Sequence, residues 1–112
     1  MLAARIAADV LIGMALLAAV VGIRAVMPPR MRTTLTPEKL GLPSQPVVLR
    51  TSDGVVLKGW FIPSAEAADV VVCLHGYPAN KSEMLAIASF LHPEYALLLF
   101  DFRAHGESGG RM

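Results

Sequence analysis

Two short segments contain most of the residues in this chain that could do chemistry. The first is His75-Gly76-Tyr77-Pro78, and the second runs from Asp101 to Gly110 with the sequence DFRAHGESGG. Each segment directly follows a short apolar run, so each is expected where a buried strand ends. In an open parallel sheet, ligands bind just beyond the carboxyl ends of the strands. We therefore expect the candidate site at these two loops.

Neither a metal site nor a nucleic-acid surface is indicated. The three histidines, at positions 75, 92 and 105, and the single cysteine, Cys73, show none of the usual zinc-ligand spacings. One cysteine forms no internal disulfide, which excludes a disulfide-stapled secreted scaffold. The net charge is +1, and no basic run is present. We expect no metal, no cofactor and no nucleic-acid partner.

The motif G-x-S-x-G occurs at Gly106-Glu107-Ser108-Gly109-Gly110. In a nucleophile elbow, this motif places the serine on a sharp turn that leads directly from a strand into a helix. Ser108 instead lies seven residues after Asp101, beyond a loop, and only four residues follow it. We therefore expect Ser108 to support the loop and not to act as a nucleophile.

The elements that position the two loops form a βαβ pattern. Asp69–Leu74 and Tyr95–Phe100 are apolar on both faces, as in strands of a sheet that is covered on both sides. Between them, Asn80 and Glu83 form a predicted capping box, and Pro93 ends the helix. The predicted apolar stripe of this helix is Met84, Ile87, Ala88 and Leu91. The crossover should be right-handed.

A β-hairpin precedes this unit. Val47–Thr51 and Val55–Ile62 alternate with a period of two, and Ser52-Asp53-Gly54 between them is a turn signal. The fold class is therefore α/β, a β-hairpin followed by a βαβ unit, behind an N-terminal transmembrane helix.

Prolines separate the N-terminal segment from the strands. Five occur between residues 28 and 46, which excludes a helix interior or a central strand and indicates a semi-extended linker. Within it, Thr36-Pro37-Glu38-Lys39 predicts one helical turn that Gly41 ends. The predicted organisation is an anchor over residues 1–27, a linker over 28–45 and a domain over 46–112.

The N-terminal segment is predicted to be a membrane anchor. Apolar residues make up 54% of the chain and charged residues 17%, against about 25% in typical globular domains. Val10–Ile23 has no charge, and Asp9 and Arg24 can extend their charges toward the interfaces. We expect residues 6–27 to contact membrane lipid in a single pass. A cleaved signal peptide and a buried soluble helix are the alternatives.

Arginines set the expected orientation of this anchor. Arg5 lies before the apolar run, whereas Arg24, Arg30 and Arg32 follow it. The positive-inside rule therefore favours a cytoplasmic location for the rest of the chain. For the signal-peptide alternative, Val20-Val21-Gly22 is the best candidate cleavage site, although it fits the small-residue pattern poorly.

The segments DVVVCLHGYPANKSEM and ALLLFDFRAHGESGG together resemble the first half of an α/β-hydrolase. They are most similar to the serine-hydrolase branch with serine-aminopeptidase-like and membrane-anchored acyl-hydrolase members. In that family a His-Gly-x-x loop follows the third strand, and an Asp-x-Arg-Gly-His-Gly-x-Ser loop follows the fourth. The resemblance runs from about Pro46 to Gly110. It implies that the fourth strand lies between the second and the third.

The resemblance implies half of an oxyanion hole after the third strand. The backbone N–H of Tyr77 would be one of its two donors, held by the turn at His75 and Gly76. The loop after the fourth strand would be scaffold. Its implied loop-supporting residues are Asp101, Arg103, His105, Gly106 and Ser108.

Two positions depart from the family pattern. Ala104 stands where the family usually has glycine, which would strain the turn if φ there is positive. Pro78 stands where near relatives often have glycine. Because His-Gly-x-Pro also occurs in epoxide hydrolases and haloalkane dehalogenases, a member with an Asp nucleophile is an alternative.

The triad of such a hydrolase would follow the fourth strand, in the order Ser, Asp or Glu, and His. The sequence reaches Met112 before any of the three, so we expect the 112-residue chain itself to be inactive. One hypothesis is the N-terminal part of a membrane-anchored serine hydrolase. It would cleave an ester, thioester or amide bond of a small-molecule or peptide acyl substrate. The other is a non-catalytic, membrane-tethered remnant or interaction protein.

Overall fold

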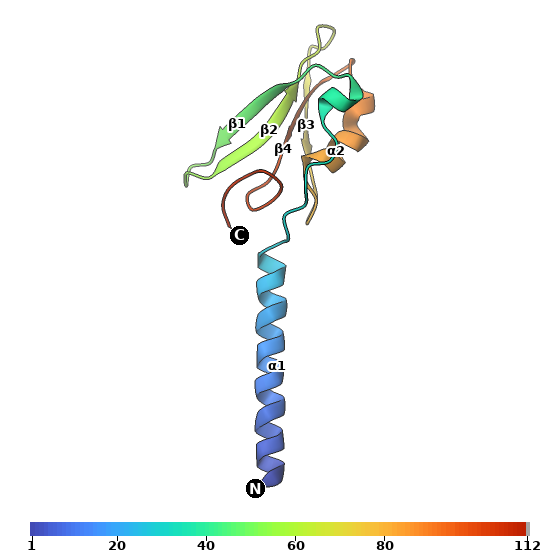
Figure 1. Ribbon diagram of the computed structural model, residues 1–112. Helices are drawn as coiled ribbons and strands as arrows, with labels where there is room; N and C mark the ends of the chain where they lie inside the picture. The colour runs from blue at the N-terminus through green and yellow to red at the C-terminus, as the bar shows by residue number, and fades with distance from the viewer. Residues whose placement is uncertain (112) are drawn as a thin grey trace.

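The N-terminal helix α1 (Leu2–Val26) stands clear of the other elements in the computed structural model, which describes residues 1–111 (Figure 1). None of its residues is buried. At about 1.5 Å per residue, its 25 residues extend about 37 Å, which exceeds the ~30 Å hydrocarbon core of a bilayer. By length and composition, α1 fits both a membrane anchor and a signal sequence.

The rest of the chain forms a mixed four-stranded sheet. Its strands are β1 (Gln45–Arg50), β2 (Val56–Ile62), β3 (Val70–Leu74) and β4 (Ala96–Phe100). They lie in the order β1-β2-β4-β3, so the fourth strand lies between the second and third, as the resemblance implied. The β1–β2 and β2–β4 pairs are antiparallel, and the β3–β4 pair is parallel. All four predicted strands are present, with bounds shifted by one or two residues.

Helix α2 (Lys81–Ala88) connects β3 to β4 and is followed by a 3-10 turn, η2 (Ser89–Leu91). Asn80 caps α2, because its side-chain oxygen accepts a hydrogen bond of 2.9 Å from the Ser82 N–H. The predicted capping box is not completed, since within residues 1–111 the Glu83 side chain accepts no hydrogen bond from the Asn80 N–H. The predicted apolar stripe is wrong at Ile87, whose side chain is exposed. Leu85 is fully buried instead. The buried residues of α2 still follow the helical period, and they are Lys81, Ser82, Leu85 and Ala88, so the face that the sheet covers is turned away from Ile87.

The hydrophobic core lies on one face of the sheet, beneath α2. Its buried members are Ile62, Cys73, Leu85, Ala88, Leu97 and Leu99. The other face of β3 is open, since Val70, Val72 and Leu74 alternate with these core positions and are each about half exposed. The βαβ unit therefore has one helix on a sheet with two apolar faces.

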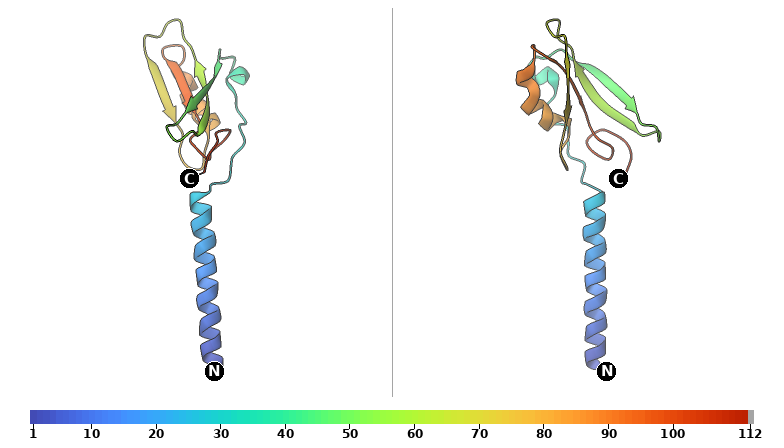
Figure 2. Two further views of the ribbon diagram at one scale, coloured as in Figure 1. Left: turned by 90° about the vertical axis from the view of Figure 1, so that its left-hand side faces the viewer. Right: turned by 180° about the vertical axis from the view of Figure 1, so that it is seen from behind.

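Residues 28–44 contain the predicted turn, η1 (Pro37–Leu40), which Gly41 ends in the left-handed conformation. This segment does not stand free as a spacer but lies against the domain. Asn80 Nδ2 donates to the carbonyls of Met31 and Arg32, and Ser82 Oγ donates to that of Leu35. Figure 2 shows η1 and α2 on the same face of the sheet. The four prolines of this segment have no N–H to donate, so its carbonyls are free to accept hydrogen bonds from polar side chains at the start of α2.

Candidate active site

An open hollow of about 720 Å³ lies at the carboxyl ends of β3 and β4. Its lining residues are Thr51, Leu57, His75, Tyr77, Phe100, Phe102, Arg103 and His105. Phe100 is paired with Leu74 and Gly59 on the neighbouring strands, on the face of the sheet away from α2. The hollow therefore combines the two predicted loops with apolar side chains of the open face. Its size falls within the usual range for small-molecule sites.

His75 joins the two loops. Its Nε2 atom accepts a hydrogen bond of 2.9 Å from the Phe102 N–H, and its Nδ1 atom lies 2.9 Å from the Gly76 carbonyl oxygen. A ring nitrogen that accepts carries no proton, so the proton is on Nδ1, which donates to Gly76. With both nitrogens used and the ring buried, His75 positions the loops and has no nitrogen left for proton transfer.

Tyr77 has an exposed side chain and a free backbone donor. Its hydroxyl donates to the carbonyl oxygen of Arg24, in the last turn of α1, at 3.2 Å. Within residues 1–111, its backbone N–H donates no hydrogen bond to another protein group. The turn around it is closed by a 2.9 Å hydrogen bond from the Ala79 N–H to the Gly76 carbonyl. A fixed loop with a free N–H is the local structure that an oxyanion donor requires.

Asp101 organises the loop after β4. Its carboxylate is fully buried and accepts from the Lys81 N–H at 2.7 Å, the Lys81 Nζ at 2.7 Å and the Glu107 N–H at 2.9 Å. Its carbonyl oxygen accepts from Ser108 Oγ at 2.6 Å. One residue thus closes the loop upon itself and ties it to the start of α2.

Lys81 is a residue of this cluster that the sequence motifs do not reveal. Its Nζ atom is buried between Asp101 and Glu107, with the Glu107 carboxylate at 2.6 Å, and lies 4.7 Å from the ring centre of Trp60. The hydrogen bond from Lys81 holds the pKa of Glu107 below its usual range. One signal was available: a lysine in the first turn of a helix opposes the helix dipole, so it needs a nearby carboxylate.

Gly106 and Ser108 are fixed by the same network. Gly106 has a φ of 46°, and a Cβ atom there would overlap the Asp101 carboxylate, so only glycine fits without a shift. Ser108 is buried, and its Oγ atom also accepts from the Lys58 N–H at 2.9 Å. Both hydrogen-bonding roles of the hydroxyl are therefore used inside the protein.

The two remaining residues of the loop motif reach different surroundings. Arg103 forms a bidentate ion pair with Asp53 in the β1–β2 turn, in which Nη1 donates to Oδ2 at 2.8 Å and Nη2 donates to Oδ1 at 2.9 Å. These hydrogen bonds lower the pKa of Asp53. His105 is buried beside His75, with ring centres 5.1 Å apart. Its Nδ1 atom lies 2.9 Å from the Arg103 carbonyl, whereas its Nε2 atom has no partner within the part of the chain that the structure describes.

Ala104 has a φ of 64°, the left-handed value that would strain a residue with a side chain. The sequence predicted backbone strain at Ala104 if its φ is positive, and the positive φ confirms that this condition is met. The Ala104 N–H donates to the Gly109 carbonyl at 2.8 Å, which holds the residue in this conformation.

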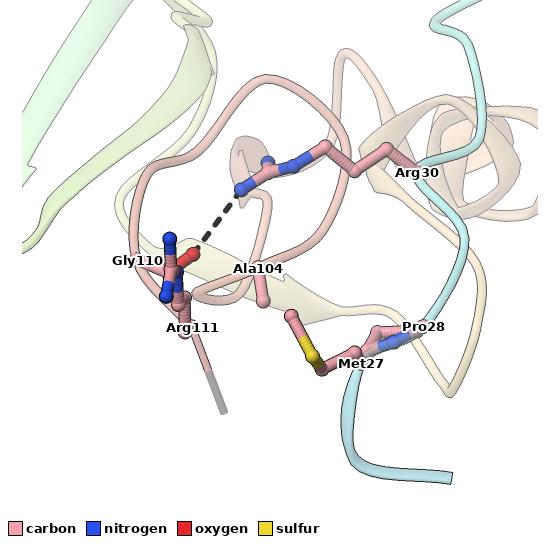
Figure 3. A pocket seen from close by; sticks show the side chains of 6 residues that line it. All are labelled: Met27, Pro28, Arg30, Ala104, Gly110 and Arg111. Atoms are coloured by element: carbon pink, nitrogen blue, oxygen red, sulfur yellow. Dashed lines mark hydrogen bonds between the residues drawn. The ribbon is translucent and has the colours of Figure 1, made fainter. Parts of the chain in front are cut away.

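Arg30 attaches the segment after α1 to this loop, a contact that no motif indicated. Its Nη1 atom donates to the carbonyls of His105, Gly106 and Ser108, and its Nη2 atom donates to that of Gly110 at 3.3 Å. Figure 3 shows Arg30 and Gly110 above Met27 and Pro28, where they line a small cavity of about 200 Å³. A guanidinium with five donors suits such a ring of carbonyls.

Metal and reactive-thiol chemistry find no support in the same region. Within residues 1–111, no group of three or more His, Cys, Asp or Glu side chains is placed to hold a metal ion. Cys73 is buried in the core, and that burial raises the pKa of its thiol, which disfavours the thiolate form.

No protein-family model matches the chain, but individual proteins do. The Pyrococcus furiosus esterase Pf2001 shares 39% sequence identity, with a TM-score of 0.70, over 76% of this chain and 34% of the esterase. The α/β-hydrolase GrgF from Penicillium sp. sh18 is 30% identical, with a TM-score of 0.51, over 62% of this chain and 25% of GrgF.

A curated relative gives a similar result. A thiohydrolase of Eupenicillium brefeldianum is 33% identical over 70 residues, which are 61% of this chain and 23% of the thiohydrolase. The chain spans about a quarter of the length of the curated relatives it matches. The sheet, α2 and the two loops therefore form part of an α/β-hydrolase fold, corresponding to its N-terminal region.

Proposed function

We propose that this chain is the N-terminal part of a membrane-anchored serine hydrolase that cleaves an ester, thioester or amide bond. The observation that carries the proposal is the state of the loop after β3. There the Tyr77 N–H is free at the rim of an apolar hollow, while His75 fixes the loop from behind. The similarity to an esterase and to a thiohydrolase favours an ester or a thioester as the bond.

In this proposal, Tyr77 acts through its backbone. When a nucleophile attacks a carbonyl group, negative charge develops on the carbonyl oxygen, and a fixed N–H donor stabilises it without reorganisation. The second donor would be the N–H of the residue after the nucleophile, on a fifth strand outside these residues. Losing one such donor costs about 2.7–4 kcal/mol of transition-state stabilisation.

Helix α1 is proposed to be the membrane anchor of this hydrolase and not a cleaved signal. Its exposed apolar surface needs lipid around it, and Arg30, four residues beyond its end, is built into the domain. The best candidate cleavage site, Val20-Val21-Gly22, fits the small-residue pattern of signal peptides poorly, which favours an uncleaved anchor. With Arg24, Arg30 and Arg32 after the helix, the proposed location of the domain is the cytoplasm.

Two measurements test the proposal. Reading the source gene past codon 112 should reveal an in-frame G-x-S-x-G after a fifth apolar strand, followed by Asp or Glu and then His. A stop codon directly after Met112 would leave the non-catalytic alternative. The protein made from the intact gene should hydrolyse a p-nitrophenyl ester, and the isolated 112-residue chain should not. Hydrolysis by neither would contradict the hydrolase.

A further inference from the structure

The loop after β4 has an unusual backbone. Ala104, Gly106 and Gly110 have positive φ values of 64°, 46° and 87°. This path turns four carbonyl groups toward one place, where the Arg30 guanidinium donates to all of them. Figure 3 shows Arg30 reaching across to Gly110 from the segment after α1. Carbonyl oxygens that converge repel one another, and a cation with several N–H donors compensates them. Arg30 therefore stabilises this loop shape.

Arg30 is itself held in place, because the residues after it bind the start of α2. The side chains of Asn80 and Ser82 donate to the backbone carbonyls of residues 31, 32 and 35, at distances of 3.0, 3.1 and 2.7 Å. We call residues 30–35 the strap. Asn80 and Ser82 are buried although they begin a helix at the surface of the domain, since the strap covers them. The strap thus joins the loop after β4 to α2.

The loop after β4 in turn contacts the loop that carries the proposed oxyanion donor. The His105 ring lies edge-on to the Tyr77 ring, with ring centres 5.7 Å apart, and lies 5.1 Å from the His75 ring. The Phe102 N–H donates to His75 Nε2 at 2.9 Å. Because Arg30 binds the His105 carbonyl, a single residue separates the guanidinium from Tyr77. A displaced loop after β4 therefore displaces Tyr77 as well.

We propose that Arg30 is a positioning residue for the oxyanion donor, and that the strap is a functional part of the site and not a spacer. This inference rests on the proposed hydrolase function and extends it to the segment after α1. Arg30 does not touch the reacting atoms. It fixes the loop after β4, whose His105 ring holds Tyr77 in place. Misplacing a catalytic group by about 1 Å can slow a reaction about 100-fold, even when the altered residue is far from the chemistry.

Limited proteolysis of the full chain in detergent tests the strap without using activity. Trypsin needs a segment that can leave the domain, so a bound strap protects the bonds after Arg30 and Arg32. Asn80→Asp keeps the oxygen that caps α2 but loses the Nδ2 donor to the strap. The matched control, Glu83→Gln, changes an exposed residue in the same helical turn. Cleavage should be several-fold faster in Asn80→Asp than in the wild type and the control. Equal cleavage of all three overturns the inference.

Kinetics of the protein made from the intact gene test the role of Arg30. Its side chain is exposed, so Arg30→Ala leaves no buried cavity. Arg32→Ala is the matched control, because it removes the same charge from a side chain that makes no hydrogen bond within residues 1–111. With a p-nitrophenyl ester, kcat per fluorophosphonate-labelled enzyme should fall about 10- to 100-fold in Arg30→Ala, with KM nearly unchanged. The control should keep the wild-type kcat. A wild-type kcat in Arg30→Ala, or an equal loss in both variants, overturns the inference.

A conservative variant tests whether Arg30 acts by compensating the loop carbonyls. Arg30→Lys keeps the positive charge and three N–H donors but lacks the planar fork of arginine. Its kcat should exceed that of Arg30→Ala, and a lysine variant no more active than the alanine variant overturns the inference. Wild-type protein that neither hydrolyses the ester nor takes up a fluorophosphonate label refutes the hydrolase function itself. Active wild type with an unaffected Arg30→Ala refutes only the positioning role.

Discussion

The loops after β3 and β4 both contain a His-Gly pair, His75-Gly76 and His105-Gly106, yet the surroundings of the two pairs differ. The loop after β4 is filled by its own polar groups, with Asp101 at the centre. The loop after β3 is held by His75 and by the hydrogen bond from the Ala79 N–H to the Gly76 carbonyl, and within residues 1–111 nothing accepts from the Tyr77 N–H. The same dipeptide is therefore part of a rigid, self-contained loop after β4, and precedes an exposed hydrogen-bond donor, the Tyr77 N–H, after β3. The buried carboxylate of Asp101 makes the difference.

The largest expected effect on stability comes from disrupting the support, which is the hydrogen-bonded loop after β4 with Asp101 at its centre. Asp101→Asn leaves the buried ammonium group of Lys81 without its main partner, which typically costs about 3–5 kcal/mol of folding free energy. Asp69→Asn changes an exposed aspartate and should alter stability by less than about 0.5 kcal/mol. Thermal unfolding of the full chain in detergent, followed by circular dichroism, measures both. A similar midpoint for the two variants would contradict the role of Asp101.

The loop after β3 should respond in catalysis and not in stability. Tyr77→Pro removes the proposed donor, whereas Tyr77→Phe keeps it and changes only the side chain. In the protein made from the intact gene, kcat should fall about 100- to 1000-fold for the proline variant. It should stay near the wild-type value for the phenylalanine variant. Equal activity of the two variants, with both folded, would exclude the Tyr77 N–H as a donor.

The paired glycines give the sharpest comparison of the two loops. Gly106→Ala forces a side chain into a left-handed conformation and against the Asp101 carboxylate, so a loss of at least about 2 kcal/mol is expected. Gly76→Ala meets nothing within 4 Å and should change stability by less than about 0.5 kcal/mol. Urea unfolding of both variants in the same detergent checks this. Gly76→Ala as harmful as Gly106→Ala would remove the distinction.

The sequence predicted local features of this fold better than distant ones. The hairpin turn, the Asn80 cap and the left-handed Gly41 follow from residues within a few positions of one another, and the structure has them. The contacts of Arg30 join residues more than 70 positions apart and leave no pattern in the sequence. The burial of Lys81 follows only weakly from its place in the first turn of a helix, because lysines are rarely buried and its carboxylate partners lie 20 and 26 positions further along the chain.

A smaller effect is expected from relieving the strain in the support. Ala104→Gly removes the cost of a left-handed alanine, about 1–2 kcal/mol, but gives the unfolded chain more freedom, worth about 0.4–1 kcal/mol. The net expectation is a gain in stability of between about 0 and about 1.6 kcal/mol, measured as a rise in the unfolding midpoint. A clear loss would mean that the methyl group of buried Ala104 contributes more by packing than it costs in strain.

The smallest effect concerns Glu107 at the exposed side of the support. Its pKa is lowered in the folded state by the hydrogen bond from Lys81. Its contribution to stability is therefore full above the ordinary value of about 4.3 and is lost as the pH falls through the lower folded-state pKa. Because half of the side chain is exposed, the contribution should be below about 1 kcal/mol. Wild type and Glu107→Gln should differ in stability at pH 7 and converge once the pH is below the lowered folded-state pKa of Glu107. A constant difference would exclude this linkage.

The most direct test of the account is to find the nucleophile. The protein made from the intact gene is treated in its own membranes with a fluorophosphonate, which bonds to activated serines, and the modified peptide is identified by mass spectrometry. The account predicts one labelled serine, in a G-x-S-x-G on a fifth strand, and no label on Ser108, whose hydroxyl is buried between Asp101 and Lys58. Label on Ser108, or on no serine at all, would contradict it.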